Sequence, residues 1–235
     1  MRNIANLAVI LAVLAFTTSP IRAANESPSP AADSVAVTPA PAKSLVPDFA
    51  YTERFLGKAD APVTITEYAM LTCPHCAELH TGPMIQIKKA YVDTGFVKII
   101  YKDFPYDEVA LKAAAVARCV PPEGYFNFIE ALFMQQGMWV QASDPLGNIK
   151  KLAGFAGLDP AVFDACASDE KLLDYILQNR VEAANQYQIN STPTFVLEGG
   201  IEKMVGVQQF ASYAQTIDRK LKEKGITPPK PAAAQ

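Results

Sequence analysis

The chain has 235 residues, half of them hydrophobic, with 21 basic and 24 acidic residues and a formal net charge of −3. This length and apolar content can bury the core of a full domain, with room for one insertion. The small negative charge excludes an electrostatic case for binding nucleic acid or an anionic membrane surface.

The first 23 residues have the pattern of a cleaved secretory signal. Arg2 gives a basic start, an apolar stretch from Ile4 to Phe16 follows, and small residues end the segment at Ala23. Because the apolar stretch is short for a bilayer span, a cleaved signal is a better interpretation than a membrane anchor. We expect the mature protein to work outside the cytoplasm, where disulfides persist.

Residues 24–47 are rich in Pro, Ala and Ser and contain few large apolar side chains. Such a composition cannot bury enough surface to fold, so we predict a disordered tether. Residues 226–235, with three prolines, predict a flexible tail for the same reason.

Two strand-like runs surround the most distinctive motif of the chain. Val63–Tyr68 is β-branched and aromatic, which is typical of a strand, and Phe96–Tyr101 is a second strand candidate. Between them, apolar residues recur with helical spacing from Cys76 to about Tyr91. Residues 51–56 are expected to add an edge strand.

The motif Cys73-Pro74-His75-Cys76 lies where the first strand gives way to the helix. A Cys-x-x-Cys pair in this context is typical of thiol–disulfide exchange. The helix N-terminus and a protonated His75 both favour a thiolate on Cys73, and the thiolate is the reactive species. We predict that Cys73 is the exposed attacking or accepting sulfur and that Cys76, one turn further in, is the more buried resolving cysteine.

Three other uses of this cysteine pair fit the chain less well. A structural zinc site needs four nitrogen or sulfur ligands, and the two histidines are His75 and His80, of which His80 has helical spacing from Cys76. A c-type haem needs histidine directly after the second cysteine, where this chain has Ala77. A purely structural disulfide across two residues adds little stability. We expect no metal ion and no other cofactor.

From about Glu108 to Tyr187 the pattern becomes almost entirely helical. Asp144-Pro145 and Asp159-Pro160 are helix-start signals, and Ser168 is expected to cap the long helix that follows.

Cys119 and Cys166 lie on separate predicted helices of this block, outside any spaced motif. In an oxidising compartment, a structural disulfide between them is favoured over two buried free thiols. Closing a loop of this length stabilises by about 4 kcal/mol in the chain-entropy description.

Strand signals return at Thr194–Leu197, and a turn leads to a partner strand, Ile201–Val205. A last helix runs from about Gln208 to Lys224 and ends at Gly225. Without the helical block, this order of elements is a βαβ-ββα core.

The sequence therefore predicts an α/β protein with a thioredoxin-like fold and a large inserted helical domain. Six segments are expected: a signal peptide (1–23), a tether (24–47), the first part of the core (48–106), the inserted helical domain (107–187), the second part of the core (188–225) and a tail (226–235).

A second part of the site is expected far along the chain, at Thr192-Pro193. Proline directly before a strand is permitted because it need not donate to the ladder. Cis X-Pro bonds are a minority, usually in tight turns, so the residues alone leave trans open. The upstream Cys-x-x-Cys unit favours cis.

With these parts assembled, the chain resembles the bacterial DsbA family of thiol:disulfide oxidoreductases over about Phe49 to Lys224. Cys73-Pro74-His75-Cys76 matches the family's usual active-site tetrapeptide. Glu67 keeps the family's acidic residue six positions before the first cysteine, and Thr192-Pro193 falls where the family has its cis-proline loop. The resemblance implies a strongly lowered cysteine pKa and an oxidising potential.

The resemblance also implies a function. It implies a periplasmic dithiol oxidase that donates disulfides to reduced or unfolded secreted proteins, is recharged by a membrane quinone-linked thiol oxidase, and works as a monomer. The alternatives are an isomerase or reductase, since Thr192 stands where oxidases of the family often have valine, and a non-catalytic peptide-binding protein.

Roles for the surrounding residues follow. Glu67, if buried, would relay the proton of Cys76, and otherwise it is a solvated charge. The backbone of Thr192 could pair with an extended substrate. Met70, Leu71 and Val205 would line an apolar groove or belong to the core.

Overall fold

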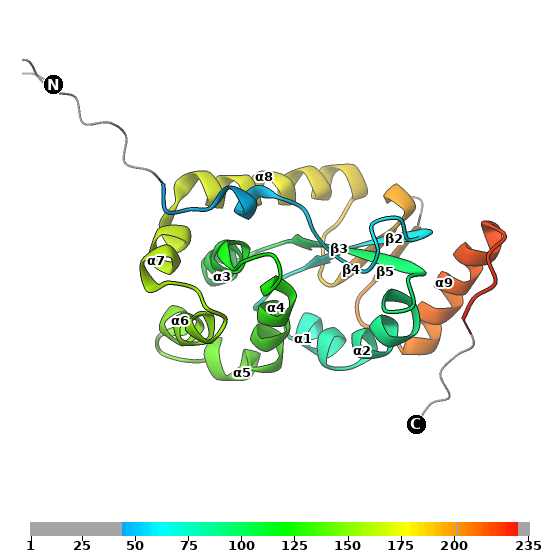
Figure 1. Cartoon of the computed structure of the whole chain (residues 1–235), viewed down its shortest axis with the longest axis horizontal. Helices are drawn as coiled ribbons and strands as arrows, with labels where there is room; N and C mark the ends of the chain where they lie inside the picture. Colours follow the sequence, from blue (N-terminus) through cyan, green and yellow to red (C-terminus); the bar gives the residue numbers. More distant parts are fainter. Residues whose placement is uncertain (1–43, 201, 230–235) are drawn as a thin grey trace, which may run out of the picture. The chain divides into compact units, whose positions relative to one another are not determined.

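The computed structural model of the protein describes residues 44–200 and 202–229 (Figure 1). The predicted signal segment lies outside these ranges, as do most of the predicted tether and residues 230–235 of the predicted tail. The tether prediction is wrong at its last residues, because the side chain of Val46 is buried in the main hydrophobic core. Within the described ranges, no helix has the length and apolar character needed to cross a bilayer.

Five strands form one mixed sheet in the order β1-β3-β2-β4-β5. β2 and β3 run parallel, and every other neighbouring pair is antiparallel. The strands are β1 (Arg54–Leu56), β2 (Val63–Ala69), β3 (Val97–Asp103), β4 (Thr194–Leu197) and β5 (Glu202–Val205).

The central strand β2 is buried on both faces. Val63 and Ile65 point into the hydrophobic cluster under α1, α2 and α9, whereas Tyr68 packs with Phe104 and α8 on the other side. Alternate residues of a strand face opposite sides of the sheet, so Glu67 points to the same side as Ile65. This register places a carboxyl group beneath the first helix.

Three helices cover the Ile65 face of the sheet: α1 (Pro74–Thr81), α2 (Pro83–Ile87) and α9 (Phe210–Glu223). A π-helical turn, Lys88–Val92, follows α2. The single helix predicted from Cys76 to Tyr91 is thus interrupted at Gly82, whose φ and ψ are −130° and −104°. Pro83 explains the break, because it lacks an N–H and disfavours helical geometry at the residue before it.

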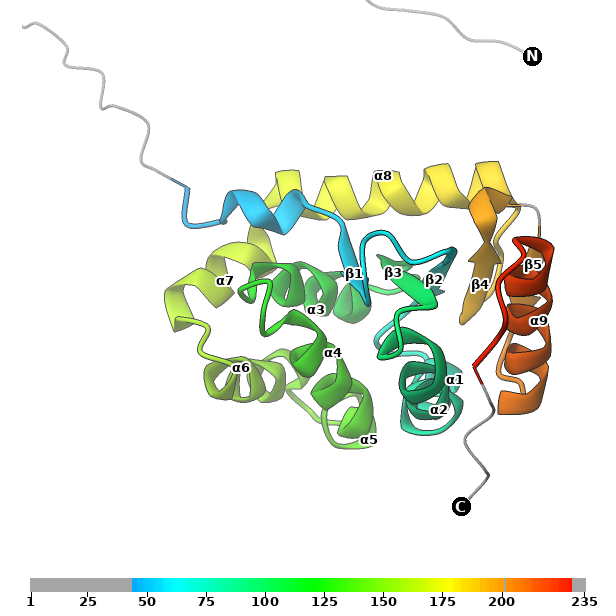
Figure 2. The same ribbon diagram turned by 45° about the vertical axis from the view of Figure 1, so that its right-hand side comes forward.

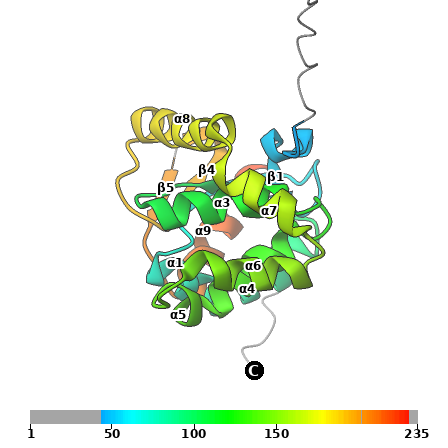
Figure 3. The same ribbon diagram turned by 90° about the vertical axis from the view of Figure 1, so that its left-hand side faces the viewer.

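The segment between β3 and β4 is the inserted helical block, which includes α8 lying along the other face of the sheet (Figures 1 and 2). Figure 1 shows α3, α6 and α7 to the left of the strands, and Figure 3, seen from that side, shows them in front of the strands. The helices are α3 (Glu108–Cys119), α4 (Tyr125–Met134), α5 (Gln136–Trp139), α6 (Pro145–Phe155), α7 (Pro160–Ser168) and α8 (Glu170–Tyr187). Short 3₁₀ turns occupy Asp48–Tyr51 and Glu198–Gly200. The predicted α/β class, a thioredoxin-like fold with a large helical insertion, is confirmed.

Aspartate side chains cap the N-termini of four inserted helices. The caps are Asp107, Asp144, Asp159 and Asp169, each accepting a hydrogen bond from a backbone N–H of the first turn. The prediction that Ser168 caps α8 is wrong by one residue. Its hydroxyl instead donates to the Asp164 carbonyl at 2.7 Å, inside α7.

A buried ion pair ties the N-terminal turn to the helical block. Arg118 Nε donates to Asp103 Oδ2 at 2.9 Å, and Arg118 also donates to the carbonyls of Ala50 and Thr52. Arg54 donates to the Arg118 carbonyl at 3.0 Å. Because both charges of the pair are removed from water, losing one partner would leave the other uncompensated.

Cys119 and Cys166 form a disulfide between α3 and α7. The Cα–Cα distance is 6.6 Å, and the two cysteines are 47 positions apart in the sequence. The bond therefore cross-links two helices within the inserted block.

Candidate active site

Cys73 and Cys76 lie at the junction of β2 and α1. Cys73 is the N-cap of α1, and Pro74 follows in the first turn, where a missing N–H costs nothing. Both cysteines are free thiols in this structure. Cys76 is fully buried, and Cys73 is only 6% exposed, so the prediction of an exposed Cys73 sulfur is wrong in degree. The cis-proline loop accounts for the difference, because its Thr192 carbonyl lies 3.5 Å from Cys73 Sγ.

The local geometry lowers the pKa of Cys73 to about 5. The largest cause is a hydrogen bond from the Cys76 thiol, and partial burial opposes it. The Thr192 side chain and the backbone N–H groups of Cys76 and His75 add further hydrogen bonds. Because every one of these donors stabilises the charged sulfur, Cys73 is a thiolate at neutral pH.

Cys76 has the opposite character. Burial raises its pKa far above the ordinary range, and the neighbouring Cys73 and Glu67 raise it further. The backbone N–H of Met70 donates to Cys76 Sγ at 3.5 Å. One sulfur of the pair is thus charged and the other holds its proton, as an attacking and a resolving cysteine require.

His75 acts on the site differently from the prediction. Its imidazole is exposed and pairs with Glu78 at 3.3 Å. The contribution of His75 to the thiolate comes from its backbone N–H, which belongs to the free first turn of α1.

The Thr192–Pro193 peptide bond is cis. The Pro193 carbonyl accepts a hydrogen bond from the Gly206 N–H at 2.8 Å, and the Thr194 hydroxyl donates to the Ser191 carbonyl at 2.8 Å. These bonds hold the loop that precedes β4 against the residue that follows β5. The loop thereby brings Thr192 to Cys73, although the two residues are 119 positions apart in the sequence.

Glu67 is 1% exposed, which removes the alternative of a solvated charge. Its Oε1 lies 2.9 Å from Nε2 of His80, a residue that the sequence suggested only as an unlikely metal ligand. Within the described ranges, no group of three or more His, Cys, Asp and Glu residues is placed to hold a metal ion.

The sequence reasoning missed Gln136. Its side-chain amide is buried and donates to the carbonyls of Leu71 and Cys73 at 2.7 and 2.9 Å. Gln136 opens α5, a four-residue helix without a periodic pattern, so no local signal singled it out. These two bonds hold the strand-to-helix junction against the inserted block.

The three residues that were expected to line an apolar groove or belong to the core differ in their burial. Leu71 is buried and belongs to the core, whereas Val205 is 53% exposed. Met70 is half-buried, and its Sδ accepts a hydrogen bond from the Tyr106 N–H at 3.3 Å. Leu71 therefore cannot line a groove.

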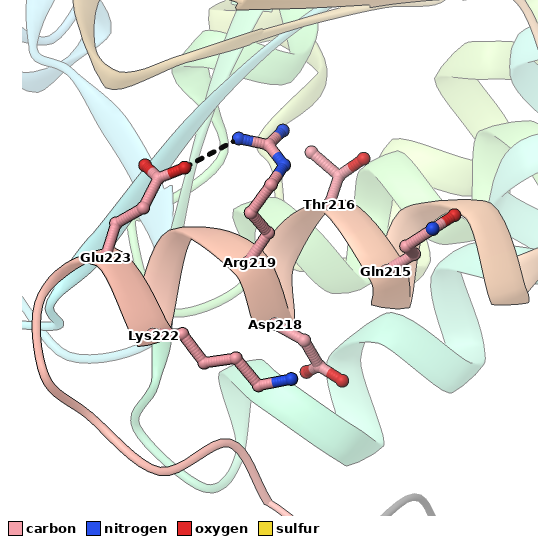
Figure 4. A pocket seen from close by; sticks show the side chains of 6 residues that line it. All are labelled: Gln215, Thr216, Asp218, Arg219, Lys222 and Glu223. Carbon is pink, nitrogen blue, oxygen red and sulfur yellow. Dashed lines mark hydrogen bonds and ion pairs between the residues drawn. The ribbon is translucent and has the colours of Figure 1, made fainter.

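A polar surface pocket lies elsewhere, on α9. Its lining residues are Gln215, Thr216, Asp218, Arg219, Lys222 and Glu223, and Arg219 pairs with Glu223 at 2.9 Å (Figure 4). None of the candidate site residues lines it.

Comparisons with known proteins agree with this geometry. A family model described as Thioredoxin matches residues 50–219. The crystal structure of Wolbachia pipientis alpha-DsbA1 is 31% identical, with a TM-score of 0.68 over 73% of this chain and 92% of that chain. Oxidised BdbD from Bacillus subtilis is 25% identical, with a TM-score of 0.62 over 72% of this chain and 93% of that chain.

A Rickettsia felis protein assigned as a protein-disulfide oxidoreductase is 26% identical over 170 residues, which are 72% of this chain. The match covers 60% of the length of that protein. The family match extends over the cysteine pair, the helical insertion and the cis-proline loop. The chain belongs to the DsbA family of thioredoxin-fold proteins.

Proposed function

We propose that this protein is a thiol:disulfide oxidoreductase that donates the Cys73–Cys76 disulfide to reduced proteins. The observation that carries the proposal is the position of Cys73 at the N-terminus of α1 and against the cis-proline loop, with Cys76 fully buried one turn further in. This geometry lowers the pKa of Cys73 to about 5 and raises that of Cys76. Stabilising one thiolate stabilises the reduced form of the pair, and a stable reduced form makes its disulfide a strong oxidant.

The first step is attack on Cys73. A substrate thiolate attacks Cys73 Sγ, the Sγ–Sγ bond breaks, and the electron pair stays on Cys76 Sγ, which takes up a proton. A mixed disulfide between the substrate and Cys73 results.

The second step releases the product. Another thiolate of the substrate attacks the substrate sulfur of the mixed disulfide, and Cys73 leaves as a thiolate. Its low pKa makes Cys73 a good leaving group, and the substrate departs with a new disulfide.

Residues around the pair have distinct roles in this proposal. Pro74 and the first turn of α1 direct N–H groups, including that of His75, at Cys73. Glu67, buried beside Cys76, supplies the proton that Cys76 takes up. The Thr192–Pro193 loop offers backbone to an extended substrate, which would displace the Cys73–Thr192 contact.

The relatives support thiol–disulfide chemistry for this protein. They do not distinguish an oxidase from an isomerase or reductase. BdbD and alpha-DsbA1 belong to the same family, and the Rickettsia felis relative is assigned to protein-disulfide chemistry. Isomerase or reductase activity is the second candidate, because Thr192 stands where oxidases of the family often have valine.

We place the activity in the periplasm. The signal-like first 23 residues and the disulfide between Cys119 and Cys166 support this proposal, because structural disulfides persist in oxidising compartments. The proposed partners are reduced secreted proteins and a membrane quinone-linked thiol oxidase that regenerates the disulfide, with the protein acting as a monomer.

Oxidation of reduced, unfolded ribonuclease A tests the proposal. The oxidised protein should form ribonuclease disulfides stoichiometrically, with the potential of the Cys73–Cys76 pair above the glutathione poise. A potential near that of thioredoxin, about −270 mV, would favour the isomerase or reductase instead. Full activity of a Cys73→Ser variant would contradict both and support a peptide-binding protein.

A further inference from the structure

His80 lies in an enclosed position at the end of α1. Its ring stacks on Phe133 of α4, with centroids 4.2 Å apart and planes 22° from parallel. The edge of Tyr101 from β3 approaches at 6.3 Å between centroids. The side chain is only 6% exposed, so the imidazole is held in one orientation between the sheet and the inserted block.

The two ring nitrogens have different surroundings. Nε2 lies 2.9 Å from Oε1 of Glu67, which is itself 1% exposed. Nδ1 is buried and makes no hydrogen bond to any residue in the described part of the chain. A buried polar atom without a partner is costly, so its retention beside an active site calls for an explanation.

His80 also lines a surface pocket of about 410 Å³, of which Glu67 is not a lining residue. Charged residues also line it: Lys88, Lys89, Asp93 and Glu130, of which Lys88 and Glu130 form an ion pair. The same residue thus contacts a buried carboxyl group and lines a surface pocket whose walls are partly charged and partly apolar.

We propose that His80 passes protons between this pocket and Glu67, and through Glu67 to the buried Cys76 sulfur. The proposal rests on the disulfide chemistry proposed above. It makes His80 a positioning and proton-carrying residue that does not contact the substrate. It also gives Glu67 the route to water that its burial otherwise denies.

The proton steps balance as follows. When the Cys73–Cys76 bond breaks, Cys76 Sγ takes a proton from Oε2 of Glu67. Water that enters from the pocket then adds a proton to the buried Nδ1 of His80, while the Nε2 proton moves to Oε1. The carboxyl group is neutral again, one solvent proton has reached Cys76, and the ring proton has moved from Nε2 to Nδ1. Regeneration of the disulfide reverses each step.

Regeneration of the Cys73–Cys76 disulfide from a mixed disulfide with glutathione tests the proposed proton transfer separately from substrate oxidation. In the protein carrying glutathione on Cys73, Cys76 must lose its proton before it attacks Cys73 Sγ and releases reduced glutathione. His80→Gln keeps an amide donor near Glu67 but cannot carry a proton. We expect glutathione release to slow by at least about tenfold in this variant, a modest share of what general acid–base catalysis contributes.

The pH profile separates proton transfer from a structural role. In the wild-type protein the release rate should depend less steeply on pH than in the variant, since the Glu67–His80 pair accepts the proton. In His80→Gln, hydroxide must remove it, so the logarithm of the rate should rise with a slope of about one per pH unit. Lys89→Gln, which changes the pocket lining but leaves the pair intact, should keep the wild-type profile.

A measurement on the wild-type protein keeps the proposal testable if the variant does not fold. The chain has two histidines, so nitrogen NMR resolves each ring. The proton of His80 should lie on Nε2 in the disulfide form and on Nδ1 in the dithiol form. The same tautomer in both forms, or a wild-type pH profile in His80→Gln, would overturn the proposal.

The two proposals can fail separately. A wild-type protein that does not oxidise ribonuclease A refutes the proposed donor function, yet glutathione release still tests His80. Normal oxidation together with an unchanged tautomer refutes the role of His80 alone.

Discussion

The pH dependence of the redox potential tests the charge state of Cys73 directly. Reducing the disulfide takes two electrons and one proton when Cys73 stays a thiolate, and two protons when both sulfurs become thiols. Each proton changes a two-electron potential by about 30 mV per pH unit. Because the pKa of Cys73 is lowered to about 5, the potential should fall by about 30 mV per pH unit above pH 5 and by about 59 mV per unit below it.

The lowered pKa of Cys73 also determines how strongly the reduced form is favoured at neutral pH, and therefore how far the redox potential rises. Lowering the Cys73 pKa from 9.0 to about 5 favours the reduced form, by about 100-fold at pH 7, or about 2.7 kcal/mol and about 59 mV. Screening by solvent makes these figures upper bounds. A depressed pKa stabilises the folded dithiol protein above that pKa, so this stabilisation is lost as the pH falls through about 5.

The assay equilibrates the protein with glutathione mixtures between about pH 4 and pH 9, traps thiols by acid and alkylation, and counts them by mass spectrometry. The Cys119–Cys166 disulfide should remain bonded throughout, which the same spectra check. A slope of about 59 mV per pH unit persisting through neutral pH would refute the reasoning, because Cys73 would then be a thiol.

Three further changes have defined outcomes. Cys76→Ala should raise the pKa of Cys73 above about 5, measured by thiolate absorbance, because it removes the largest lowering hydrogen bond. Replacing Cys119 and Cys166 together by alanine should lower the free energy of unfolding in urea, since the disulfide closes a loop across 47 residues; the expected loss is about 4 kcal/mol. Arg118→Ala should cost about 3–5 kcal/mol in the same assay, because a buried carboxylate loses its partner.

The substitutions at Cys76 and Arg118 each have a matched control. Cys76→Ser retains a donor beside Cys73 and should raise its pKa less than Cys76→Ala does, so equal shifts would contradict the assigned cause. Arg219→Ala removes an exposed arginine that pairs with Glu223, and it should leave the unfolding midpoint nearly unchanged. A loss as large as that of Arg118→Ala would contradict the argument from burial.

The parts predicted well from the sequence are those with local causes. The β-branched run before Cys73, the Asp-Pro helix starts and the glycine turn after β4 each act on their own neighbours, and each element lies close to its predicted place. The errors are also local. The helix break at Gly82 follows from Pro83, and the cap of α8 moved by one residue to Asp169.

The parts that could not be predicted depend on contacts between distant segments. The exposure of Cys73 is set by the Thr192 carbonyl, 119 positions away, and the burial of Glu67 by the packing of α1 on the sheet. Gln136 belongs to a four-residue helix without a sequence pattern, and only the tertiary structure brings its side chain to the Leu71 carbonyl. Periodicity reports which face of an element is apolar, but it does not report which side chain from another element completes a site.

The inserted helical block supplies part of the site as well as part of the core. Gln136 binds the carbonyl of Cys73, and Phe133 stacks on the imidazole that bonds to Glu67. A thioredoxin-like core without the insertion would lack both contacts, leaving the strand-to-helix junction and the His80 ring free to move. The block therefore holds the backbone of one cysteine and the imidazole for which we propose proton transfer. Substitutions at these two positions should alter redox rates without touching either sulfur.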